Sequence, residues 1–223
     1  MIAVWSVGAV ILALGTPARA QAPTEALRPI LAPWDAPTKW SAYLEGKGAS
    51  PDPLACDALV DDQVRLCLRV REGDRLRWVT TGDLERWSLS LEQAVGLVRE
   101  ASTTHLSDAR PVQVVDMNHE FLQLVDGEGW AASLALQPDR VARMLGPDTR
   151  FAFPAGTVAL AWRAGDGELD KVMAVGVVEL AEEQPGEVTR TVFRWDGKGF
   201  VPYAEAKLPA VDAPKEQQSP ATQ

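Results

Sequence analysis

The sequence predicts one α+β domain, built on a mainly antiparallel sheet with about three helices packed on one face. Two observations lead to this class. The apolar patterns predict a hairpin, a helix, three strands, a helix, two strands, a helix and a closing hairpin, in that order. Most connections between the strands are too short for the crossovers that parallel strands require. Helices set against a short-connected antiparallel sheet are typical of the α+β class.

The domain is predicted to span residues 57–205 and to begin with a two-stranded hairpin. Apolar residues alternate along "QVRLCLRV" (63–70), and "RLRWVT" (75–80) continues the pattern after a turn. The opposite face is predicted to carry four arginines, namely Arg65, Arg69, Arg75 and Arg77. They form either an anion-binding patch or a solvent-exposed face whose charges pair with nearby acids.

A helix follows the hairpin. Ser90 can cap it, and Gln93 lies three residues later, which is the spacing of a capping box. Three apolar segments after this helix are predicted as strands, namely residues 111–117, 120–126 and 130–136. A short helix then begins at Pro138, and the pair Gly146 and Pro147 ends it.

The last part of the domain is predicted as two strands, a helix and a hairpin. "RFAF" and "TVALAWR" form a strand pair around the turn at 154–156. Asp166 is expected to cap a helix over 167–183; its valine-rich centre could form a strand, but the helical spacing fits better. "TRTVFRWDGKGFVPY" predicts a closing hairpin with its turn at 196–197.

Both flanks are predicted to lie outside the domain. Residues 1–20 read as a secretory signal peptide, because a short apolar run ends in a small-x-small cleavage pattern; a retained anchor is the alternative. Residues 21–56 form a proline-rich arm, in which Trp34 and Trp40 favour partial docking. Residues 206–223 are predicted to be a disordered tail. The protein is therefore expected to be secreted or periplasmic, with no transmembrane segment after cleavage.

The two cysteines, Cys56 and Cys67, are predicted to form a structural disulfide, because an exported protein enters an oxidising compartment. Two buried free thiols are the alternative. Their spacing lacks the C-x-x-C arrangement of redox catalysts, and no histidine pair lies nearby to complete a zinc site.

The net charge argues against nucleic-acid partners. The whole chain carries −9, and removal of the signal peptide with its single arginine leaves 21 basic against 31 acidic residues, or −10. An acidic surface repels phosphate backbones and anionic membranes. The expected partner is an unknown protein or a component of the cell envelope.

Several local segments resemble the YtpQ-like family, a bacterial domain of unknown function. They are "TTGDLERWSLSLEQAVGLVREA", "VDGEGWAASLAL", "FAFPAGTVALAW" and the late "TVFRW", and the resemblance covers about residues 60–205. It implies the same fold and no accepted activity. In the family a polar pair tends to follow the proline equivalent to Pro154, whereas Ala155 and Gly156 follow it here.

The sequence predicts no catalytic residues, no metal ligands and no cofactor. The stretch "DMNHEFLQLVDGEGW" (116–130) brings five ionisable residues together and is the one to test for a metal or acid–base site. Asp116, His119 and Glu120 are placed at one strand corner, and Asp126 and Glu128 at the next. A strand of about 20 Å separates the corners, so the five residues are not expected to form one site.

Five tryptophans lie at strand or helix boundaries and are candidate ligand contacts, namely Trp78, Trp87, Trp130, Trp162 and Trp195. They either pack in the core and its rim, or form a platform for a ligand or peptide. The favoured function is a non-enzymatic binding module of the cell envelope. The alternatives are an exported hydrolase with paired carboxylates, which predicts a pocket holding two acids and a raised pKa, and a small-ligand binder with exposed tryptophans.

Overall fold

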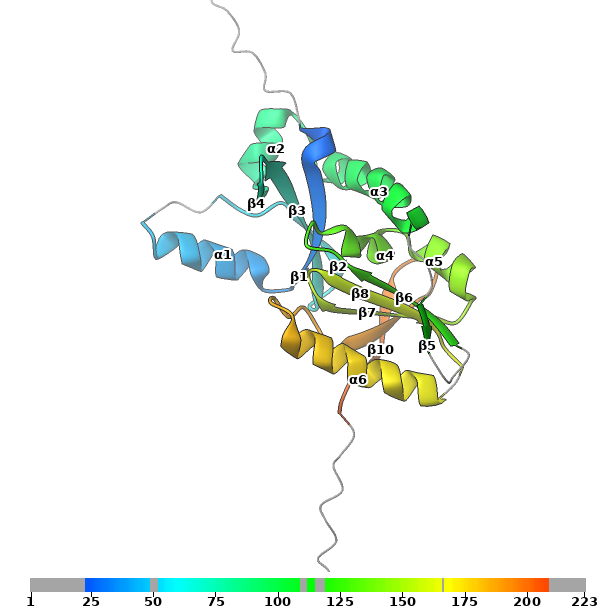
Figure 1. Cartoon of the computed structure of the whole chain (residues 1–223). Helices are drawn as coiled ribbons and strands as arrows, with labels where there is room; N and C mark the ends of the chain where they lie inside the picture. The colour runs from blue at the N-terminus through cyan, green and yellow to red at the C-terminus, as the bar shows by residue number, and fades with distance from the viewer. Residues whose placement is uncertain (1–22, 49–51, 109–111, 115–118, 166, 209–223) are drawn as a thin grey trace, which may run out of the picture.

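Two antiparallel sheets meet over one shared hydrophobic core, which confirms the α+β class (Figure 1). The computed structural model describes residues 23–48, 52–108, 112–114, 119–165 and 167–208. The predicted signal peptide lies outside the described residues. None of the described helices has the length and apolarity that a membrane span requires.

The small sheet is built around one long central strand. Its strands are β1 (Leu27–Pro33), β2 (Cys56–Val60), β3 (Val64–Glu72) and β4 (Arg75–Trp78). β1 pairs with one side of β3, while β2 and β4 pair with the two halves of the other side. The alternating apolar residues of β3, from Val64 to Val70, are buried against the shared core. The predicted hairpin over 63–80 is therefore confirmed.

The large sheet has six strands in the order β10-β9-β7-β8-β6-β5. They are β5 (Val112–Val114), β6 (His119–Val125), β7 (Thr149–Ala155), β8 (Val158–Arg163), β9 (Thr191–Trp195) and β10 (Phe200–Glu205). The strand pair around residues 154–156 and the closing hairpin are confirmed.

Helices cover both faces of the large sheet rather than one. The α-helices are α1 (Ala36–Glu45), α2 (Thr81–Trp87), α3 (Leu91–Asp108), α4 (Ser133–Leu136), α5 (Pro138–Leu145) and α6 (Gly167–Glu183), with short 3₁₀ turns η1 (Thr24–Ala26) and η2 (Trp130–Ala132). Met173 and Val177 of α6 pack with Leu160 and Trp162 on one face. α3, α4 and α5 contribute to the core on the other face, and Figure 1 shows α6 on the opposite side of the sheet from α4.

The capping box at α3 is confirmed. The backbone N–H of Ser90 donates to Gln93 Oε1 at 2.8 Å, and the backbone N–H of Gln93 donates to Ser90 Oγ at 3.1 Å. A second box begins α2, a helix that the sequence did not predict: Thr80 caps this helix together with Asp83.

The predicted strand over 130–136 is wrong, because these residues form η2 and α4. The whole segment is buried, so its apolar residues show no period that separates a strand from a helix. The side chain of Asp126 decides the outcome. It accepts from the backbone N–H groups of Glu128 and Trp130, at 2.8 and 3.0 Å, and turns the chain into the helix.

The proline-rich segment is not wholly an arm, because it supplies β1 and α1. Leu27 and Leu31 of β1 are 1% exposed and belong to the shared core. Among the described strands, β1 pairs with β3 alone, so Pro29 can lie in this edge strand without leaving a neighbouring strand short of a donor. The predicted tail also begins later, since Ala206 is 4% exposed and donates to Arg190 O at 2.9 Å; residues 209–223 lie outside the described residues.

Candidate functional site

Two of the five candidate tryptophans are buried on opposite faces of the large sheet. Trp162 is 1% exposed beneath α6, and its Nε1 donates to Asp170 Oδ1 at 2.8 Å. Trp130 is 8% exposed on the other side, where the imidazole of His105 stacks on it at 3.8 Å between ring centroids. Neither indole forms part of an exposed platform.

The other three tryptophans are half-buried and lie apart. Trp87 ends α2 and packs against the shared core. Trp78 and Trp195 each line a different pocket. The structure therefore does not bring the five residues together, and the two that lie at cavities must be considered separately.

The polar stretch 116–130 does not form one described site. Residues 116–118 lie outside the described residues, and His119 and Glu120 begin β6. At the second corner Asp126 holds the turn, while the Glu128 carboxylate pairs with Arg28 and Arg71. Within the part of the chain that the structure describes, no group of three His, Cys, Asp or Glu could hold a metal ion.

Among the residues that the structure describes, three carboxyl groups have a shifted pKa, and in each the shift is downward. Burial tends to raise the pKa of Asp83, but hydrogen bonds from Arg77, the Thr80 backbone and Arg86 outweigh it and lower the pKa to about 2. Hydrogen bonds from Thr80 and its neighbours lower the pKa of Asp52. Hydrogen bonds from backbone N–H groups, chiefly the N–H of Gly199, lower the pKa of Asp196. These three carboxyl groups are stabilised in their charged form, whereas a carboxylate hydrolase would use an acid with a raised pKa.

The four arginines of the first hairpin do not share one face. The turn pairs Glu72 with Arg75, so Arg69 lies opposite Trp78 and Val70 lies opposite Arg77. Directly opposed residues share a face of an antiparallel sheet. The predicted patch is therefore split: Arg65 and Arg69 lie on the outer face with Trp78, whereas Arg75 and Arg77 lie on the side of Val70.

The disulfide between Cys56 and Cys67 is confirmed, with an S–S distance of 2.01 Å. The two residues are direct partners in the pairing of β2 with β3. The bond therefore staples β2 to the central strand of the small sheet.

The main candidate site is a groove of about 500 Å³ where α3, α5 and the β9–β10 hairpin converge. Gln137 positions α5, because its Nε2 donates to Arg99 O at 2.7 Å and to Thr103 Oγ1 at 3.0 Å. Pro138 then begins the helix, at a position where its missing N–H is not needed. The result is a fixed junction between α3 and α5.

Basic side chains dominate the polar lining of this groove. They are Arg99 of α3, Arg140 and Arg143 of α5, and Lys198 of the hairpin turn. Arg140 and Arg143 are three residues apart on a helix, which places them on the same face. Arg99 and Arg143 form no ion pair or side-chain hydrogen bond with any residue that the structure describes. The cationic groups are contributed by three separate elements.

Asp139 is the one acid among the described residues that line the groove, and Trp195 holds it. The Trp195 Nε1 donates to Asp139 Oδ1 at 2.7 Å. The Trp195 ring also lies 5.1 Å from that of Phe200, and Leu59 and Leu136 complete the apolar wall. A groove of this kind combines an apolar wall with cations able to bind an anionic group.

Sequence reasoning identified Trp195 but missed its basic neighbours. Arg140 and Arg143 share one face of a predicted helix, and this spacing was the available signal. Nothing in the pattern along the chain could bring Arg99 and Lys198 to the same place, because their proximity depends on how α3 and the last hairpin pack.

No protein-family model, curated protein or solved structure matches this chain. The resemblance to the YtpQ-like family therefore stays a prediction, and the function must be argued from the groove itself.

Proposed function

We propose that this protein is an exported, non-enzymatic binding module of the cell envelope whose groove takes an anionic ligand. The observation that carries the proposal is the charge of the groove: three arginines and one lysine face one aspartate on a chain whose net charge is −9. Local positive charge on an acidic protein favours a specific anion over general attraction to negatively charged surfaces.

The apolar wall favours a ligand that has an apolar portion as well as a charged group. Trp195 is half-buried and stands beside Phe200, so a flat or apolar portion of the ligand can lie against its ring. Guanidinium groups bind carboxylates and phosphates in a planar, bidentate manner. A carboxylated saccharide or a phosphate ester would both meet these requirements.

Binding rather than turnover is favoured by the acids of the groove. A hydrolase with paired carboxylates needs two acids at the reacting bond. Asp139 is the one acid among the described residues that line the groove, and it already accepts a hydrogen bond from Trp195. The predicted signal peptide and the disulfide support export, since disulfides persist in oxidising compartments.

The test is a titration of the purified chain with oligogalacturonate and with inorganic tripolyphosphate, using neutral dextran as the control. We expect saturable binding to at least one anion. The double variant Arg99→Glu/Arg143→Glu should weaken it at least about tenfold. The matched variant Arg75→Glu/Lys171→Glu changes the net charge equally at exposed positions away from the groove and should bind as the parent does.

Two outcomes would contradict the proposal. Equal loss of binding in both double variants would indicate a general charge effect without a site in the groove. Release of shortened oligogalacturonate or of orthophosphate, dependent on the groove residues, would show an enzyme in place of a binding module.

A further inference from the structure

A second pocket lies beside β4 of the small sheet, between α1 and the beginning of α2. Its volume is about 600 Å³. Trp40 of α1 and Trp78 of β4 line it together with Leu76, and its polar side consists of Arg77, Asp83 and Arg86. Two tryptophans from segments far apart in the sequence thus meet at one cavity, outside the groove described above.

The acid of this pocket is fully engaged. Asp83 accepts from Arg77 at 2.6 and 3.2 Å, from Arg86 at 2.5 Å and from the Thr80 backbone N–H at 3.0 Å. Its side chain is 3% exposed. A ligand therefore cannot gain a strong contact with this carboxylate, and the surface that remains for binding is formed mainly by the two indoles and Leu76.

The apolar side contains one hydrogen-bond donor without an acceptor. The Nε1 of Trp40 is buried and makes no hydrogen bond with the residues that the structure describes. An indole N–H can only donate, so its complement is a carbonyl or another acceptor oxygen. The chemistry of the pocket calls for an apolar ligand that carries acceptors.

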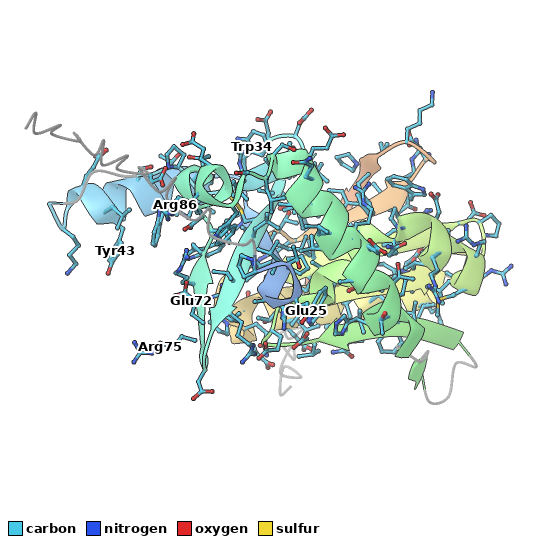
Figure 2. All side chains as sticks on the ribbon, turned by 90° about the horizontal axis from the view of Figure 1, so that it is seen from above. Glu25, Trp34, Tyr43, Glu72, Arg75 and Arg86 are labelled. Atoms are coloured by element: carbon cyan, nitrogen blue, oxygen red, sulfur yellow. A yellow bond between two sulfur atoms is a disulfide. The ribbon has the colours of Figure 1, made fainter. Side chains whose placement is uncertain are left out.

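The helix that carries Trp40 is weakly attached and can adjust to a ligand. No residue of α1 is buried, and a ten-residue helix is only marginally stable alone. Tyr43 stacks on Trp40 with 6.1 Å between ring centroids and is 59% exposed, and Figure 2 shows it projecting from α1. The aromatic surface therefore continues from the pocket onto exposed helix.

We propose that this pocket docks a proline-rich segment of a partner protein, flanked by acidic residues. Proline rings are apolar and stack on aromatic side chains, and the carbonyls of an extended proline helix are strong acceptors. The prolines of such a segment have no backbone N–H, so packing them against the two indoles buries no unpaired donor. Its conformation is already formed, which lowers the entropy lost on binding.

Charge complementarity selects the acidic flanks. Around Trp78 lie Arg69, Arg77 and Arg86, while the acids that pair with them are Glu72 and Asp83. The Asp52 carboxylate, which accepts from Thr80 Oγ1 at 2.8 Å, adds a third acid, so the charges of this region balance and Arg69 is the arginine left without an acidic partner. Arg69, whose guanidinium lies 5.2 Å from the Trp78 ring centroid, has no ion pair with the described residues. Arg69 Nε is also buried without a hydrogen-bond partner among the described residues, so glutamates beside the prolines would pair with this arginine.

The experiment uses the full chain and a fluorescent probe of ten prolines followed by two glutamates, with anisotropy as the readout. Trp40→Ala and Trp78→Ala should each weaken binding about tenfold or more. Trp40→Phe keeps an aromatic ring without the N–H and should show a smaller loss. The matched control, Trp195→Ala, removes a half-buried indole from the separate groove and should change affinity less than about twofold.

The urea midpoint of each variant shows whether it remains folded. If an alanine variant does not fold, Trp40→Phe still tests the proposal. Equal binding of a probe with alanines in place of the prolines would overturn the proposal. So would unchanged affinity in Trp40→Phe and Trp78→Ala, or equal loss in Trp195→Ala. Because the groove is tested with oligogalacturonate and tripolyphosphate, the two sites can fail independently.

Discussion

The two arginine-bearing surfaces of this molecule differ in what surrounds their guanidinium groups. Three arginines of the small sheet each lie over a tryptophan. The distances from guanidinium carbon to ring centroid are 5.3 Å for Arg28 over Trp130, 3.8 Å for Arg65 over Trp34 and 5.2 Å for Arg69 over Trp78. Cation–π contacts of this kind stabilise a fold by about 0.5–2 kcal/mol each.

Two arginines of the groove lack such contacts with the described residues. Arg99 and Arg143 neither stack on a ring nor form an ion pair with the residues that the structure describes. Their positive charge is directed at solvent in the groove instead of at the protein. The number of arginines in a segment therefore says little about binding, because the neighbouring residues determine whether a charge stabilises the fold or remains available to a ligand.

The largest effect is expected for the disulfide that joins two strands of the small sheet. The double variant Cys56→Ala/Cys67→Ala should lower the free energy of unfolding by about 3 kcal/mol, because closing a short loop removes conformational entropy from the unfolded chain. Urea denaturation measures this difference. A reductant should destabilise the wild type by a similar amount and leave the double variant unaffected; sensitivity of the variant to reductant would contradict the prediction.

The next largest effect concerns Asp83, which neutralises Arg77 and Arg86 at the edge of the same sheet. Its pKa in the fold is about 2, against an ordinary value of 3.8. Since the folded pKa is lowered, the stabilisation is complete above the ordinary value and is lost as the pH falls from about 4 to about 2. The difference in pKa corresponds to about 2 kcal/mol.

Urea denaturation of Asp83→Asn tests this. The variant should be about 2 kcal/mol less stable than the wild type at pH 6, and the gap should shrink as the pH approaches 2. Asp61→Asn, at an exposed turn, is the control and should match the wild type at every pH. A gap that does not depend on pH would show that packing, rather than the charge of Asp83, stabilises this edge.

The sequence was informative wherever local chemistry decides the structure. The capping box at Ser90, the hairpin turns and the pairing of Cys56 with Cys67 all depend on residues close together in the chain. The strand predicted over 130–136 failed because a fully buried segment has no polar face to mark its period. β1 was missed because its prolines suggested a linker, although an edge strand tolerates them.

The groove could be predicted only in part, for a different reason. The half-exposed Trp195 and the spacing of Arg140 and Arg143 are visible in the sequence. Their convergence with Arg99 depends on the packing of α3 against α5 through Gln137, which no local pattern encodes. The same holds for the meeting of Trp40 with Trp78, since these two residues lie 38 positions apart in the chain (78 − 40).

The third prediction tests the comparison directly, by neutralising one arginine on each surface. Arg143→Gln should weaken binding of the anion that the titration identifies by about fivefold and leave the free energy of unfolding unchanged. Arg65→Gln should do the reverse: it loses its contact with Trp34, so the fold becomes about 1 kcal/mol less stable while anion affinity stays constant. Calorimetric titration and urea denaturation of both variants give the two readouts. Similar affinity losses in both would show that the surfaces do not differ as proposed.

The smallest expected effect is a gain of affinity from Asp139→Asn. The amide oxygen can still accept from Trp195 Nε1, so the indole keeps its position, while the negative charge of the groove is removed. Anion binding should therefore strengthen by about twofold, as expected for an exposed charge screened by water. Asp148→Asn, at an exposed loop position, removes the same charge outside the groove lining and should have no effect. If the gain is absent at low salt, where charge effects are largest, Asp139 does not oppose the ligand and the anion must bind away from the Trp195 end of the groove.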